Sequence, residues 1–118
     1  MKAIKRIINK AQQNRKRIIL SEAQDPRVLA AARMAVDRKI AHITLVGDKQ
    51  VIRDAAKLHQ VSLAGVHIVS PDSSPLKEVL AERYYLLRKA KGLSYDQALQ
   101  QVQDPLIFAN LMVREGLS

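Results

Sequence analysis

Three short apolar runs recur along this chain at intervals of about 24 residues, and they constrain its fold more than any other feature. They cover residues 18–20, 42–46 and 66–69, and each contains β-branched side chains. The first run, with two β-branched residues in a row, is typical of a strand buried on both faces of a parallel sheet. The segments between them carry apolar residues at helical spacing. The order strand-helix-strand-helix-strand with short connections therefore predicts an α/β fold built from parallel βαβ units.

An aspartate precedes each of the two helices that join these strands, where its side chain can accept hydrogen bonds from free backbone N–H groups. Asp25, with Pro26 in the first turn, predicts a helix to about residue 39 that ends in Arg38 and Lys39. The side chains expected to face inward are Val28, Leu29, Ala32, Ala35 and Val36. Asp48 begins a helix at about 49–58, with inward residues Val51, Ile52, Ala55, Ala56 and Leu58.

After residue 74 the pattern predicts helices only. The first covers 76–91, ends at Gly92 and has the inward stripe Leu76, Val79, Leu80, Tyr84 and Leu87. Ser94 and Gln97 form a capping box for a helix at about 95–103, and Asp104-Pro105 starts another. That last helix is apolar nearly all round, with Leu106, Ile107, Phe108, Ala109, Leu111, Met112 and Val113. We expect a helix with so little polar surface to be buried.

A parallel sheet needs helices on both faces. We therefore predict a three-layer α/β/α architecture with a parallel sheet. Three strands and an apolar last helix make a poor independent domain. We expect residues 1–118 to form an incomplete fold that is cut off from something larger or pairs with another chain.

Composition excludes several classes of protein. No cysteine is present, so disulfides and thiolate metal sites are impossible, which fits a cytoplasmic location. No run approaches 18 apolar residues, and the start lacks the apolar segment of a secretory signal, so we expect no membrane partner.

The net charge of +9 comes mainly from residues 1–17, which hold seven basic residues and no acid. The stripe Ile4, Ile7, Ile8 and Ala11 predicts an amphipathic helix there. No aromatic residue lies among these charges, which argues against stacking with nucleic-acid bases. We expect a solvated helix face and no nucleic-acid partner, with a basic nucleic-acid surface as the alternative.

Two arginines are candidate ligand contacts. Arg27 follows the first strand together with Glu22 and Gln24, and ligands of open α/β sheets bind beyond the carboxyl ends of the strands. Arg27 would contact an anion or form a local ion pair with Glu22 or Asp25, and the sequence leaves both open. Arg88 belongs to a basic helix end, 88–91, which would either complement the helix dipole or bind a phosphate-bearing ligand.

No catalytic motif is present in the sequence. The glycines are too far apart for a phosphate loop, and no nucleophile elbow occurs. His42, His59 and His67 lack a metal-binding spacing, and we expect structural roles for them. We predict no catalytic and no metal-binding residue in this chain.

Three stretches resemble the N-terminal part of phosphate acetyltransferase (phosphotransacetylase), in the phosphate acetyl/butyryltransferase family. The first is Arg17-Ile18-Ile19-Leu20-Ser21-Glu22, followed by Asp25-x-Arg27 and Ala30-Ala31-Ala32. The second is Ile40-Ala41-His42-Ile43-Thr44-Leu45-Val46-Gly47. The third runs from Arg88-Lys89-Ala90-Lys91-Gly92 to Phe108-Ala109-Asn110-Leu111-Met112-Val113-x-x-Gly116. Ser21 departs from the proline that is usual after the first strand.

The resemblance implies transfer of an acetyl group between coenzyme A and phosphate, with coenzyme A as a substrate and no separate cofactor. Arg88 matches an arginine implicated in coenzyme A binding, and Arg27 matches a second one near the same ligand. The family's catalytic residues would lie beyond residue 118, so we expect these 118 residues alone to be inactive. The resemblance also implies a cytoplasmic homo-oligomer, most simply a dimer, in acetate metabolism.

Other functions stay open at this point. Within the family the alternatives are phosphate butyryltransferase and the related domain that follows malic enzymes. Outside it, the chain could be a non-catalytic module that binds coenzyme A weakly or assembles through its apolar last helix.

Overall fold

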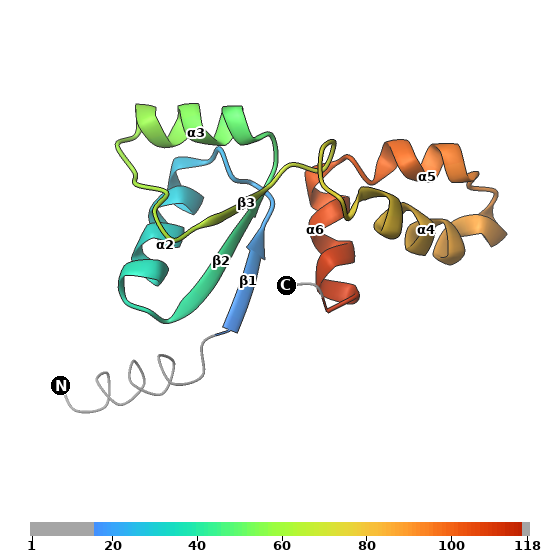
Figure 1. Ribbon diagram of the computed structural model, residues 1–118, viewed down its shortest axis with the longest axis horizontal. Coiled ribbons are helices and arrows are strands. Elements are labelled where there is room, and N and C mark those ends of the chain that lie inside the picture. Colours follow the sequence, from blue (N-terminus) through green and yellow to red (C-terminus); the bar gives the residue numbers. More distant parts are fainter. Residues whose placement is uncertain (1–15, 117–118) are drawn as a thin grey trace.

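The computed structural model describes residues 16–116, which form a three-stranded parallel sheet with helices on both faces (Figure 1). The strands are β1 (Lys16–Leu20), β2 (Ala41–Val46) and β3 (His67–Val69), in the order β1-β2-β3. Their register sets Leu20, Leu45 and Ile68 in one row across the sheet. Side chains of one row point to the same face. The predicted parallel α/β fold is confirmed.

One face of the sheet is covered by α2 (Pro26–Asp37) and α3 (Lys49–Leu58). The buried residues between these helices and the strands are Ala23, Leu29, Ala32, Ala41, Ile43, Leu45, Ile52 and Ala56. Arg33 of α2 binds the loop that follows α3, since its Nη1 donates hydrogen bonds to the carbonyl oxygens of Ser62 at 2.9 Å and Ala64 at 2.7 Å. This half of the fold is therefore stabilised by an apolar core and by hydrogen bonds at its edge.

The other face is covered by α6 (Pro105–Arg114), which packs on β1 and β2. Between β3 and α6 the chain forms α4 (Lys77–Arg88), the short 3-10 helix η1 (Lys89–Lys91) and α5 (Tyr95–Gln101). The second core consists of Val46, Leu80, Ala81, Val102, Phe108, Ala109, Leu111 and Met112. α6 lies next to the strands, whereas α4 and α5 form an arm that points away from the sheet (Figure 1). Both faces are thus covered, and the predicted three layers are confirmed.

The end of α2 differs from the prediction, because Arg38 and Lys39 lie beyond the helix. The backbone N–H of Ile40 donates to the carbonyl oxygen of Ala35, and this turn leaves Lys39 in a left-handed conformation with φ 55°. The two cations therefore follow the helix and do not occupy its last turn.

The helix predicted over 76–91 is divided into α4 and the tighter η1. Gly92 ends it with φ 88°, a left-handed conformation that glycine adopts without a steric penalty. The capping box of Ser94 and Gln97 and the cap from Asp104 are formed as predicted.

Four residues predicted to face the core are exposed instead: Val51, Leu58, Val79 and Leu87. Leu58 has the largest exposed fraction of these, 77%. Short helices bury only a narrow stripe, which Ile52 occupies in α3 and Leu80 in α4. Apolar residues at the margin of the predicted stripe therefore face outward.

Burial was also overestimated for the last helix and the first strand. Leu106 and Val113 of α6 are largely exposed, because only one side of α6 packs on the second core. β1 is an edge strand whose Ile18 is exposed, and the prediction of a strand buried on both faces is wrong for it.

The predicted amphipathic helix with Ile4, Ile7, Ile8 and Ala11 lies outside the described residues. Between residues 16 and 116, no helix has the length and apolar character that a membrane crossing would require.

Candidate functional site

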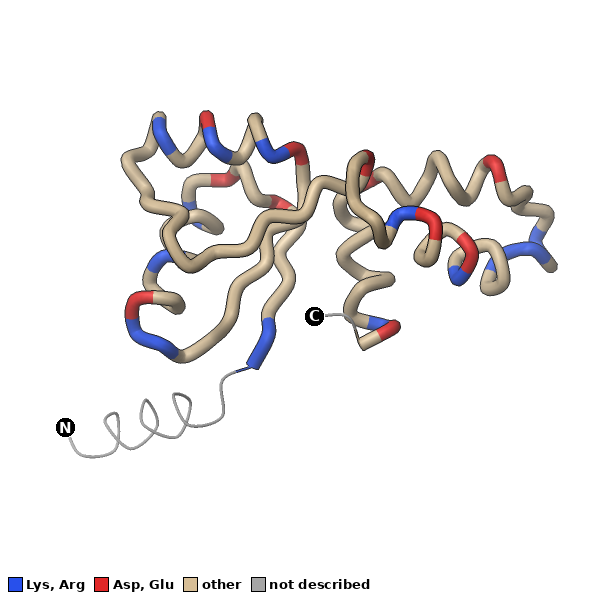
Figure 2. Tube along the Cα trace, viewed as in Figure 1, with Lys and Arg blue, Asp and Glu red and all other residues tan. Residues whose placement is uncertain are grey.

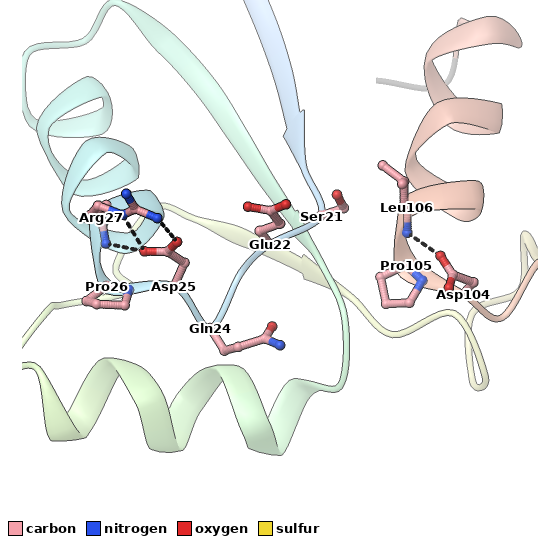
Figure 3. A pocket seen from close by; sticks show the side chains of 9 residues that line it. All are labelled: Ser21, Glu22, Gln24, Asp25, Pro26, Arg27, Asp104, Pro105 and Leu106. Carbon is pink, nitrogen blue, oxygen red and sulfur yellow. Dashed lines mark hydrogen bonds and ion pairs between the residues drawn. The ribbon is translucent and has the colours of Figure 1, made fainter.

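The loop between β1 and α2 forms the first candidate site, an open hollow of about 720 Å³ (Figure 3). Ala23 is fully buried and anchors the loop, while Glu22 and Gln24 on either side of it are exposed. The opposite wall comes from the start of α6. We call this hollow the corner pocket, and its lining residues are Ser21, Glu22, Gln24, Asp25, Pro26, Arg27, Asp104, Pro105 and Leu106.

Two helix N-termini with the same Asp-Pro start line the corner pocket. Asp25 accepts a hydrogen bond from the backbone N–H of Arg27 at 2.8 Å, and Asp104 accepts one from Leu106 at 2.9 Å. Free N–H groups at a helix start attract anions. Here the chain's own carboxylates already satisfy those donors.

Arg27 pairs with Asp25, which was one of the two arrangements that the sequence left open. Its Nη2 lies 2.9 Å from Oδ2 of Asp25, and its Nε donates to Oδ1 at 3.3 Å. The hydrogen bonds from Arg27 lower the pKa of Asp25, and the same contact raises the pKa of Arg27. The side chain of Arg27 is nevertheless 89% exposed, so solvent competes with this ion pair.

Carboxylates outnumber cations around the corner pocket. Glu22, Asp25 and Asp104 carry negative charge, and Arg27 is the one basic residue among the lining side chains. Like charges repel an approaching anion. The corner pocket is therefore poorly suited to a phosphate-bearing ligand, although it lies at the end of a strand.

A second hollow, of about 330 Å³, lies between α4 and α5 near the free end of the arm. We call it the arm pocket, and it is lined by Tyr84, Arg88, Lys91, Gly92, Leu93, Gln97 and Gln101. The turn at Gly92 reverses the chain, so that α5 returns along α4. Figure 2 shows basic residues gathered at this end of the arm. The lining contains two cations and no carboxylate.

Arg88 is held in the arm pocket by an aromatic ring. Its Cζ lies 5.7 Å from the centroid of the Tyr84 ring, within the range of a cation–π contact. The Tyr84 hydroxyl in turn donates to Oε1 of Gln101 at 3.1 Å. No described residue forms an ion pair with Arg88, so its guanidinium remains available to an anion.

The two arginines predicted as ligand contacts line different pockets. Arg27 lies at the start of α2 and Arg88 at the end of α4, with α6 between these positions in Figure 1. Within the described part of one chain, they do not converge on one small ligand. Their roles in binding coenzyme A stay predictions.

Sequence reasoning missed how three residues contribute to these pockets. Asp104 was recognised only as a helix cap, and Tyr84 only as a core residue, while Gln101 was not singled out. For Asp104 the sequence did contain a signal, because Asp-Pro occurs at the starts of two helices. Among residues 16–116, no group of three or more His, Cys, Asp and Glu side chains is placed to hold a metal ion.

Comparison with known proteins identifies the family. The sequence model of the phosphate acetyl/butaryl transferase family matches residues 2–118. A phosphate acetyltransferase from Nitratidesulfovibrio vulgaris is 37% identical over 110 residues, covering 93% of this chain and 16% of the relative. One from Clostridium acetobutylicum is 34% identical over 116 residues, covering 98% of this chain and 35% of the relative. The chain thus spans about a third or less of these relatives.

Solved structures agree on the fold. A EutD phosphotransacetylase from Staphylococcus aureus superposes with a TM-score of 0.84 at 22% identity, covering 94% of this chain and 34% of the other. A phosphotransacetylase from Streptococcus pyogenes gives a TM-score of 0.82 at 18% identity, covering 98% of this chain and 36% of the other. With the family match over almost the whole sequence, the conclusion is direct: this chain belongs to the phosphate acetyl/butaryl transferase family.

Proposed function

We propose that this chain is the N-terminal part of a phosphate acetyltransferase, which transfers an acetyl group between coenzyme A and phosphate. The family match over residues 2–118 carries the proposal. The relatives reported above, which are named phosphate acetyltransferases, support acetyl as the acyl group. We also expect the intact enzyme to be a cytoplasmic homodimer in acetate metabolism.

Within that enzyme, this segment contributes a contact to coenzyme A through Arg88. The ligand carries phosphate groups, and the arm pocket offers a cationic hollow without carboxylates. Arginine suits phosphate recognition because its planar guanidinium can donate two parallel hydrogen bonds. The acidic corner pocket makes Arg27 the weaker candidate.

The proposal is tested by exchanging Arg88 and Arg27 separately in a full-length enzyme that contains this segment. Arg88→Ala should raise the KM for coenzyme A about tenfold or more, since a hydrogen bond to a charged group contributes roughly 1.5–3 kcal/mol. The KM for acetyl phosphate should change much less. Arg27→Ala is the matched control, with an expected change below about twofold because Arg27 is already paired. Unchanged kinetics in Arg88→Ala would contradict the assignment.

The 118-residue chain itself provides the second test. We expect no acetylation of coenzyme A from acetyl phosphate by the purified chain. Turnover by this chain would show that catalytic groups lie within it.

A further inference from the structure

Tyr84 is held from two sides. Its ring packs against the second core, and its hydroxyl donates to Gln101 at 3.1 Å across the gap between α4 and α5. Arg88 lies over this ring, with its Cζ 5.7 Å from the centroid. The ring is therefore a rigid support for an otherwise exposed cation.

We infer that Tyr84, held by Gln101, is a positioning residue that fixes the Arg88 guanidinium for binding a phosphate group of coenzyme A. This inference rests on the proposed function. A free arginine side chain loses rotamer freedom when it binds a phosphate. An arginine already held over a ring has lost part of that freedom in advance, so the entropic cost of binding is smaller.

The chain supplies a matched control next to Tyr84. The ring of Tyr85 meets the ring of Tyr95 edge-on, with centroids 6.1 Å apart, whereas Arg88 lies over the ring of Tyr84. Both tyrosines are half-buried in α4. Replacing either one removes a similar ring from the same helix, but only Tyr84 supports the guanidinium.

The contact between Arg88 and the Tyr84 ring is testable in the free 118-residue chain by NMR. The side-chain protons of Arg88 should show ring-current shifts in the wild type and in Tyr84→Phe, and these shifts should disappear in Tyr84→Leu. Tyr85→Leu should leave them in place. Ordinary arginine shifts for Arg88 in the wild type would overturn the inference, whatever the chain binds.

Binding of coenzyme A to a full-length enzyme that contains this segment gives the second measurement. Tyr84→Leu should raise the Kd about two- to fivefold, the size of an exposed cation–π contribution, and Tyr85→Leu should leave it unchanged. In an Arg88→Ala background, Tyr84→Leu should not change the Kd further. If Tyr84 were merely structural, its replacement would raise the Kd with or without Arg88. An equal effect of Tyr84→Leu with and without Arg88 would overturn the inference.

The outcomes separate this inference from the proposed function. If Arg88→Ala weakens binding and Tyr84→Leu does not, the positioning role is wrong and the proposed contact stands. If Arg88→Ala in the full-length enzyme binds coenzyme A as well as the wild type does, the proposed contact and the positioning role are both overturned.

Discussion

The corner pocket and the arm pocket are both open hollows beside helix ends, and each contains an arginine, yet their charges are opposite. In the corner pocket, Arg27 is paired with Asp25 and faces two more carboxylates. In the arm pocket, Arg88 lies on Tyr84 with Lys91 nearby and no acid in the lining. What surrounds an arginine, more than its place at the end of a strand, decides whether it can bind an anion.

The two pockets also differ in how they are built. The partners of Asp25 and Asp104 are only two or three residues away in the sequence. The arm pocket depends on Tyr84 and Gln101, which are 17 residues apart and belong to different helices. The first arrangement is local, whereas the second exists only when α5 has folded back on α4.

The largest expected effect tests the core that supports the arm. Phe108→Ala should lower the free energy of unfolding by about 3–5 kcal/mol, because the fully buried Phe108 joins α6 to the second core. Leu106→Ala on the same helix is the control. Leu106 lines the corner pocket and is 58% exposed, so its loss should change stability by less than about 0.5 kcal/mol. Urea unfolding measures both, and equal losses would contradict this division of α6.

The next effect tests whether the carboxylates of the corner pocket are structural. Asp104→Ala should cost about 1 kcal/mol of stability, because it removes the acceptor for the N–H groups of Leu106 and Ile107. Asp104→Asn keeps a side-chain oxygen at the cap and should recover most of this loss. Thermal or urea unfolding checks the pair. If the two variants were equally destabilised, the cap would not be the reason for the aspartate.

The smallest effect concerns the ion pair of Arg27 and Asp25. Hydrogen bonds from Arg27 hold the pKa of Asp25 below its ordinary value of 3.8. A carboxyl with a lowered pKa in the folded state stabilises the fold above its unfolded pKa, and this contribution is lost as pH falls through the folded pKa. Arg27→Ala should therefore raise the pKa of Asp25, and the stability difference from wild type should shrink below about pH 4.

An NMR titration of the Asp25 carboxyl carbon measures this shift directly. Arg88→Ala is the control, because Arg88 lies in the arm pocket and should leave the titration of Asp25 unchanged. A titration of Asp25 that is insensitive to Arg27 would show that the pair does not persist in solution.

The elements of the fold could be predicted well because their signals are local. Asp25, Asp48 and Asp104 cap helices at the predicted positions, and Gly92 ends one as expected. The core could be predicted only in part. Apolar periodicity shows which face of a helix turns inward, but it does not show how many residues on that face are buried. Val51 and Val79 belong to the predicted stripes but are exposed, outside the buried side of their helices.

The candidate sites show the same limit. The sequence identified Arg27 and Arg88 but left open whether Arg27 would bind an anion or pair with its neighbours. That choice depends on side-chain geometry, which places Arg27 on Asp25. Spacing along the chain does not predict that Asp104 lines the corner pocket opposite Arg27. It also does not predict that Tyr84 supports Arg88.

The sequence by itself determined the order of strands and helices, their caps and the family resemblance, because these depend on residues close together in the chain and on ordered motifs. Only the tertiary structure decided that the corner pocket is acidic and the arm pocket basic. The electrostatic character of a hollow is the sum over side chains that folding brings together, and here those side chains come from separate helices and loops.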